Sequence, residues 1–201
     1  MDYTSLPNVK LEAGIQEPTD DVLLASLITS ASRWLDRELT GKPGPDSDNY
    51  LLSETVNNEA LFGQIDKDGN IVVYPHKPSV ASVTAMSWRP DTFSGWVQVD
   101  PNHLWIDGYK VVAQFSALAN GTRGKVQVQM TYTGGIALTQ SDLPADVIED
   151  VTVAVIRVYR ENKTGLTDSM GVAELGTATY TKAMPTRLMD WVKSYKRVVP
   201  W

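Results

Sequence analysis

Among the residues that could do chemistry, the first group is the run Asp-Lys-Asp-Gly-Asn at 66–70, which has the spaced oxygen donors of a calcium loop. An EF-hand loop also needs a glutamate at its twelfth position and a helix on each side. Lys77 occupies the twelfth position counted from Asp66, and strand-like sequence flanks the run. We therefore expect a plain turn in a hairpin, with Gly69 at a positive φ, and no metal.

The second group is the two histidines, His76 and His103, which are candidates for acid–base work or for activating a nucleophile. Two prolines, Pro75 and Pro78, favour extended backbone around His76, and His103 follows Pro101 closely. The sequence has no Gly-x-Ser-x-Gly nucleophile elbow. We expect both histidines on the surface or at strand ends, and a small hydrolase that uses either of them stays open as an alternative.

Other catalytic patterns are absent from the sequence. It has neither a phosphate-binding loop nor a Gly-x-Gly-x-x-Gly motif, and the run 121–125 precedes a strand-like segment, so we expect a hairpin turn there. Cysteine is absent, which excludes a disulfide framework, a thiolate metal site and a cysteine nucleophile. We therefore expect no enzyme, no catalytic residue, no cofactor and no metal site.

Composition limits the class further. The chain of 201 residues fits one domain or a domain with a sizeable insertion, and 42% hydrophobic with 21% charged residues is a globular composition. The net charge is 18 − 24 = −6, which argues against a sequence-reading DNA-binding domain. No stretch approaches eighteen apolar residues, so we expect no membrane span, and the first residues lack the pattern of a signal peptide.

Apolar spacing predicts helices at both ends of the chain. One runs over 19–39, with Leu24, Ile28 and Leu35 on one face, before a breaker cluster that begins at Gly41. A second begins near Pro144 and ends by about residue 162, and a third is expected over 185–197. The stretch 164–182 is rich in Thr, Ser and Gly, so we expect a loop.

The sequence pattern predicts β-strands in the middle of the chain. The segment 125–132 alternates polar and apolar residues, and a hairpin is expected from 62–65 and 71–74. Shorter strands are expected at 80–86, 96–99 and 104–106. The predicted fold class is α+β, a helical bundle formed by the N- and C-terminal segments 1–54 and 136–201 with an inserted antiparallel β module at 55–135.

The tryptophans offer one ligand-binding alternative. We expect Trp34 and Trp191 in a helical core, because they lie on apolar stripes. Trp88, Trp96 and Trp105 lie in the β module, where filling a small core is the simpler interpretation. If they were exposed instead, they could stack on a glycan or peptide, which would make the chain a ligand-binding β module on a helical support.

The C-terminal tail has the features of a docking segment. Trp201 ends the chain after a proline, where no core of its own is evident, so docking into a partner and packing against its own chain both stay open. Residues 1–60 carry 4 − 11 = −7 charges, whereas residues 182–201 carry 5 − 1 = +4. This asymmetry favours head-to-tail association of copies or contact with an acidic partner, although a solvated basic helix face would give the same count.

Taken in order, several segments resemble the head–tail connector (adaptor, or head-completion) proteins of tailed bacteriophages. The early helix 20–37 resembles the family's first long helix, and 72–83, with Pro75 and Pro78, is similar to its strand, Pro-x-x-Pro and strand signature. The strand into a glycine turn at 128–135, the helix opening at 143–147 and the closing helix at 188–197 resemble the next steps. The stretch from about 88 to 123 is longer than in the shortest members.

The resemblance implies a structural virion protein without catalysis. Such proteins form a homo-oligomeric ring, commonly a dodecamer matched to the portal, which extends the DNA channel in the phage neck and presents a surface for head-closure or tail proteins. Double-stranded DNA passes through without sequence recognition. The resemblance implies synthesis in the host cytoplasm, assembly into the virion neck, and portal docking through the C-terminal segment. The residues expected to dock there are Tyr195, Lys196, Arg197, Val199 and Trp201.

Overall fold

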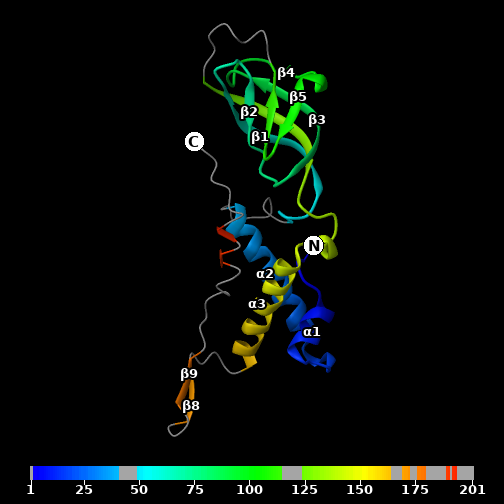
Figure 1. The fold of residues 1–201 in the computed structure, drawn as a ribbon, viewed down its shortest axis with the longest axis vertical. Coiled ribbons are helices and arrows are strands. Elements are labelled where there is room, and N and C mark those ends of the chain that lie inside the picture. Colours follow the sequence, from blue (N-terminus) through cyan, green and yellow to red (C-terminus); the bar gives the residue numbers. More distant parts are fainter. Residues whose placement is uncertain are drawn as a thin grey trace. The chain divides into compact units, whose positions relative to one another are not determined.

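The computed structural model describes residues 2–40, 49–114, 124–163, 169–172, 176–179, 189–190 and 192–193. These residues divide into two compact units, a helical unit up to Asn49 and from Gln140 onward, and a strand unit over Tyr50–Thr139 (Figure 1). The α+β class and the antiparallel sheet are confirmed. In the described part, no helix combines the length and apolar character that a bilayer span requires.

The helical unit begins with a helix that the sequence analysis missed, α1 (Leu6–Ala13). Ser5 caps its N-terminus, and Gly14, at φ 72°, ends it in the left-handed region. Only Val9 of the eight residues of α1 is buried. The helix is therefore too short and too polar to give a periodic apolar signal in the sequence.

The two long helices are confirmed. The 3₁₀ turn η1 (Pro18–Asp20) leads into α2 (Asp21–Thr40), and the 3₁₀ turn η4 (Gln140–Asp142) precedes α3 (Ala145–Lys163). The three helices share a core, whose buried members are Val9, Leu24, Ile28, Val155 and Ile156. The finer description as a helical bundle stays a prediction.

The C-terminal third agrees with the sequence analysis only in part. Residues 169–172 and 176–179 form an antiparallel hairpin of β8 (Ser169–Val172) and β9 (Gly176–Thr179), so the expectation of a loop is wrong there. A composition rich in threonine and glycine indicates a loop, but threonine is β-branched and is also favoured in strands, as at Thr177 and Thr179. Of the predicted last helix, the described residues 189–190 and 192–193 are helical, and Val192 is buried.

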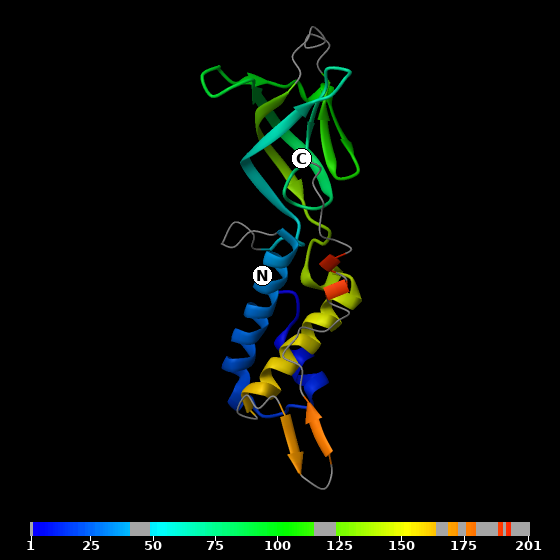
Figure 2. The same cartoon turned by 90° about the vertical axis from the view of Figure 1, so that its left-hand side faces the viewer.

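The strand unit is a curled antiparallel sheet with the order β4-β3-β7-β1-β2-β6-β5 (Figures 1 and 2). Its strands are β1 (Glu54–Ile65), β2 (Ile71–Val73), β3 (Val80–Arg89), β4 (Val97–Gln98), β5 (Leu104–Asp107), β6 (Lys110–Ala113) and β7 (Lys125–Gly134), with the 3₁₀ turn η3 (Pro101–His103) before β5. The expected hairpin corresponds to β1–β2, and β6 was not anticipated.

The inner face of the sheet forms the second core. Along β7 the side chains at 126, 128, 130 and 132 are buried and alternate with more exposed ones, as the pattern predicts. Trp88 and Met86 of β3 are buried in the same core. Gly63 of β1 leaves room for the Ile71 side chain in this core. A Cβ at position 63 would lie 2.7 Å from Cγ2 of Ile71, which is too close for two carbon atoms.

Candidate interaction sites

The run 66–70 is the turn that the sequence predicts. The Asp66 carboxylate accepts backbone N–H bonds from Asp68 at 2.9 Å and from Asn70 at 2.8 Å, and Gly69 has φ 83°. Partial burial acts to raise the pKa of Asp66, but the hydrogen bonds from Asn70 and Asp68 outweigh it and lower that pKa. No group of three or more His, Asp or Glu side chains suited to a metal ion occurs among the residues that the structure describes.

Both histidines are exposed, as expected, and His76 belongs to a polar cluster whereas His103 lies in η3. The His76 ring bonds the Glu59 carboxylate through Nδ1. The Tyr132 hydroxyl donates to the other oxygen of Glu59 at 2.8 Å and accepts the Lys77 backbone N–H at 3.1 Å. This cluster therefore joins the segment after β2 to strands β1 and β7.

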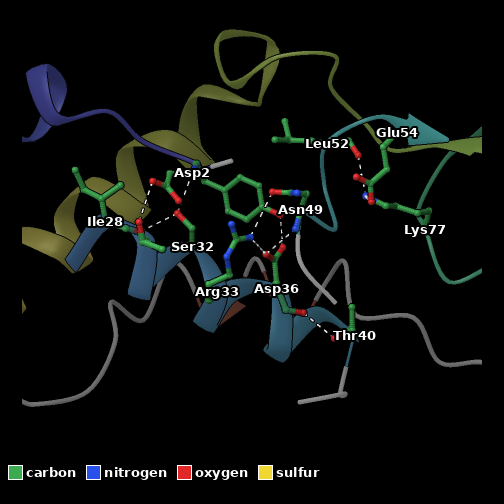
Figure 3. Close-up of polar contacts among 12 residues, drawn as sticks. Asp2, Ile28, Ser32, Arg33, Asp36, Thr40, Asn49, Leu52, Glu54 and Lys77 are labelled. Atoms are coloured by element: carbon green, nitrogen blue, oxygen red, sulfur yellow. Dashed lines mark hydrogen bonds and ion pairs between the residues drawn. The ribbon is translucent and has the colours of Figure 1, made fainter. Parts of the chain in front are cut away.

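Local backbone geometry brings Glu59 into this cluster. The β1–β7 register shifts between Val56 and Glu59, and Asn58 has φ 50° in the left-handed region that asparagine tolerates. On the neighbouring side, the buried Lys77 donates from Nζ to the Leu52 carbonyl at 3.0 Å and pairs with the Glu54 carboxylate at 2.7 Å (Figure 3). The polar atoms are used to fix chain segments to one another, so we interpret the cluster as structural.

Glu59 gives the strand unit a predicted pH dependence. Burial acts to raise its pKa, but the hydrogen bond and charge of His76, followed by the Tyr132 hydroxyl, outweigh burial and lower it. A lowered folded-state pKa means that the unfolded chain binds more protons, so this contribution is present above the ordinary glutamate pKa and is lost as pH falls through the folded value.

We therefore expect Glu59→Gln to lower the free energy of unfolding by about 1–2 kcal/mol at pH 7, with a difference from wild type that shrinks toward pH 3. Urea unfolding at pH 7, 5, 4 and 3 measures this. Asp68→Asn, which removes an exposed carboxylate of the same unit, serves as the control. An unchanged gap between wild type and Glu59→Gln at every pH would contradict the assignment.

The helical unit holds a second polar cluster around the fully buried Asp36 of α2 (Figure 3). Its carboxylate accepts the Tyr3 hydroxyl, Arg33 Nη1 at 3.0 Å and the Asn49 backbone N–H at 3.0 Å. Ser32 Oγ accepts the Tyr3 backbone N–H at 2.9 Å. The cluster holds the first residues of the chain and the residue before the strand unit against α2.

The same unit has a groove of about 440 Å³ between α1 and α3, lined by Asn8, Leu11, Glu12, Ala145, Ile148, Glu149 and Thr152. Its apolar part is formed by Leu11 and Ile148, and the Glu12 and Glu149 side chains are exposed beside them. The groove therefore presents an apolar surface next to acidic groups.

The three tryptophans of the strand unit differ in their exposure. Trp88 is in the core, but Trp96 and Trp105 are 40% and 42% exposed, so the expectation that all three fill the core is wrong for these two. Trp96 lies next to β4, and Trp105 lies on β5. These two short strands end the sheet order, so among the described residues each is hydrogen-bonded to a neighbouring strand on one side only. In the helical unit, Trp34 is half-buried, and the Trp191 side chain lies outside the described residues.

Exposed apolar side chains gather on the strand unit. They include Phe62 at 71%, Phe93 at 99% and Tyr109 at 55% exposed, and sequence analysis singled out none of them. A signal for Phe93 was present, because it is a large aromatic within the turn-forming sequence Pro-Asp-Thr-Phe-Ser-Gly at 90–95.

The family resemblance assigns portal docking to five residues in the C-terminal segment. Tyr195, Lys196, Arg197, Val199 and Trp201 lie outside the described residues, as does most of the turn expected at 121–125. Their docking role stays a prediction.

No protein-family model and no curated protein matches the chain. Among solved structures, a chain of the neck of an empty gene transfer agent (GTA) particle, computed with C6 symmetry, matches with a TM-score of 0.56 at 17% sequence identity. The match covers 99% of this chain and 92% of that chain. The fold is similar to that of a GTA neck chain.

Two further GTA structures match more loosely. A chain of the neck of the native GTA particle, computed with C12 symmetry, gives a TM-score of 0.46 at 18% identity, covering 100% of this chain and 96% of that chain. A chain of the native GTA virion gives 0.46 at 16% identity, covering 91% and 81%. Since the match to the empty-particle neck chain spans 99% of this chain, the shared fold includes both the helices and the inserted sheet.

Proposed function

We propose that the chain is a structural protein of the neck of a phage-like particle. The observation that carries this proposal is the fold similarity to a GTA neck chain over 99% of the present chain. The ordered segments that resemble phage connector proteins support it independently, because they were identified from residues alone. No catalytic step forms part of the proposal.

Within the neck, we propose a ring of identical subunits between the portal and the head-closure or tail proteins. The similar neck chain belongs to a structure computed with C6 symmetry, which supports an assembly of repeated copies. A closed ring needs two different surfaces on each subunit, and both units of this chain present exposed apolar side chains, such as Leu11 and Phe93. A twelvefold ring that matches the portal is the form we propose.

The proposed ring extends the channel through which double-stranded DNA passes. The chain's charge of −6 suits this role, because like charges along the channel keep the DNA from adhering. Sequence recognition of the DNA is not required, since an acidic protein lacks the phosphate-neutralising charge on which DNA-reading domains depend.

The C-terminal segment is the proposed contact with the portal. Its charge of 5 − 1 = +4 over residues 182–201 and its terminal Trp201 provide an electrostatic guide and an aromatic anchor. We expect deletion of residues 198–201 to weaken co-purification with the portal at least tenfold while the far-ultraviolet circular dichroism spectrum stays unchanged. Undiminished portal binding by the deletion variant would show that the tail is not the anchor.

The neck role itself is tested by affinity purification of the tagged chain from its native source. Mass spectrometry of the co-purifying proteins should identify a portal and a head-closure or tail protein. Tagged chain carrying Asp36→Ala, which we expect to destabilise the helical unit, provides a control for non-specific capture. Recovery of the folded chain without any particle protein would contradict the proposal.

A further inference from the structure

The hairpin that joins β3 to β4 holds an aromatic side chain out in solvent. Phe93 is 99% exposed, the highest value among the exposed large hydrophobic residues of the described chain. A phenylalanine in this position contributes nothing to its own core, and exposed aromatics of this kind are enriched where proteins bind one another.

The backbone around Phe93 is nevertheless well fixed by hydrogen bonds. Oδ1 of Asp91 accepts the backbone N–H groups of Phe93 and Ser94, both at 2.8 Å, and the Ser94 hydroxyl at 3.0 Å. Arg89 donates from Nη1 to the Thr92 carbonyl at 3.3 Å. A turn that is ordered before binding loses little conformational entropy when it docks.

Arg89 also fixes the base of this hairpin. Its guanidinium lies 4.4 Å from the centroid of the Trp96 ring, and its Nε donates to the Gln127 side chain on β7 at 2.7 Å. The hydrogen bonds from Phe93 and then Ser94 lower the pKa of Asp91, so its carboxylate stays charged beside Phe93. Phe93, Trp96 and Asp91 therefore form a rigid projection, which we call the Phe93 knob.

A separate apolar surface lies on the outer face of β1, β2, β6 and β5. Gln64 pairs with Val72, Val72 with Val112, and Val112 with Trp105, so these four side chains share one face, on which Val112 itself is buried. Phe62 lies two residues before Gln64 on β1 and therefore points to the same face.

Two tyrosines extend this surface beyond Phe62. Tyr74 follows β2 and stacks on Tyr109 at a centroid distance of 5.9 Å. Lys110 is paired with Asp107 at 2.8 Å beside them, and the Asp107 carboxylate raises the pKa of Lys110 and keeps it cationic. We call Phe62, Val72, Tyr74, Trp105 and Tyr109 the aromatic strip.

The knob and the strip occupy different parts of the sheet. The knob belongs to β3 and β4, whereas the strip lies on β1, β2 and the β5–β6 hairpin, and the curl of the sheet brings β3 into contact with β5. Two distinct complementary patches on one subunit are the requirement for a heterologous interface that closes into a ring. Asp91 of the knob is acidic, and Lys110 beside the strip uses one of its three N–H donors on Asp107, which leaves donors for the Asp91 carboxylate of a neighbouring copy.

We propose that the Phe93 knob of one copy docks on the aromatic strip of the next copy around the ring. This inference rests on the proposed ring and adds the surfaces through which the strand units meet. The contact buries the exposed rings of both patches, and the Asp91–Lys110 pair at its rim sets the orientation.

The test uses a photo-reactive benzophenone amino acid in place of Phe93 in the full chain. Particles are produced from a mixture of ¹⁵N-labelled and unlabelled chains, so that cross-links between copies differ in mass from those within a copy. We expect mixed-isotope cross-links from position 93 to peptides that contain Phe62, Trp105 or Tyr109. The same probe at Val22, which is 85% exposed in the helical unit, is the matched control and should not give these cross-links.

A second variant tests the energetic role. Phe93→Asp should fold as wild type does, because the side chain is almost wholly in solvent, yet it should reduce incorporation into rings at least tenfold. Val22→Asp makes the same change at another exposed apolar position and should leave incorporation within twofold of wild type.

The outcomes separate this inference from the proposed function. Cross-links to another protein, to another segment or only within one copy would overturn the docking of knob on strip while leaving the neck role intact. Normal incorporation of Phe93→Asp would overturn it as well. A wild-type chain that is absent from particles altogether would count against the proposed function instead.

Discussion

Replacing Trp88 with alanine is expected to lower the free energy of unfolding of the strand unit by about 3–5 kcal/mol. The Trp88 side chain is 7% exposed and packs in the inner core of the sheet with residues such as Met86 and Val128. The neighbouring strands are paired on both sides of β3, so they cannot collapse fully into the space that the ring leaves.

Hydrogen exchange resolved by peptide measures this effect in the unit where it arises. We expect amides of β1 and β7 to exchange much faster in Trp88→Ala, whereas those of α2 and α3 change little. Trp105→Ala, which truncates a partly exposed tryptophan of the same unit, should alter exchange only slightly. Equal loss of protection in both units would contradict the separate cores described above.

The second large effect is expected in the helical unit. Asp36→Ala should lower its stability by about 3–5 kcal/mol, because a fully buried carboxylate is removed from three donors. The Tyr3 hydroxyl, the Asn49 N–H and the Arg33 guanidinium would each lose an acceptor in a partly or wholly buried position.

Thermal unfolding followed at 222 nm reports this change, since the long helices contribute most of that signal. Asp36→Asn keeps the shape and one carbonyl acceptor, so its cost should be smaller than that of alanine. Asp2→Ala, which removes a carboxylate whose hydrogen bond to Thr29 is exposed, is the control and should stay near wild type. A wild-type melting temperature for Asp36→Ala would refute the role assigned to this cluster.

The long periodic segments were predictable from sequence because local pattern and tertiary burial agree in them. The apolar stripe that includes Leu24 and Ile28 becomes the buried face of α2, and the alternation at 125–132 becomes the buried and exposed faces of β7. The turn at Asp66 was predictable for a similar reason, since its own side chain makes the hydrogen bonds that fix it.

Elements that depend on partners distant in sequence were not predictable. The helix α1 is stabilised by Val9 packing against α2 and α3, and four-residue β6 exists because it pairs with β2 and β5. The Glu59 cluster needs a bulge in β1 to meet His76 and Tyr132, and nothing in the local sequence specifies that register shift. Composition also could not separate Trp88 from Trp105, because exposure depends on which face of the curled sheet each side chain occupies.

The candidate interaction sites also divide into those that the sequence predicts and those that depend on long-range pairing. Charge asymmetry and the terminal Trp201 could be read from sequence, and they support the proposed portal contact. The Phe93 knob and the aromatic strip required the sheet register, since the strip assembles residues from β1, β2 and β5 and from the segments that follow β2 and β5. Surfaces formed by long-range pairing become visible only when the fold is known.

Electron microscopy of the chain purified from its native source tests the central claim most directly. The neck proposal predicts hollow rings, or particles in which this chain forms a ring between portal and tail, with a rotational symmetry that class averages would reveal. A folded chain found only as a lone monomer, with no ring in isolation and no density in particles from the same source, would contradict it.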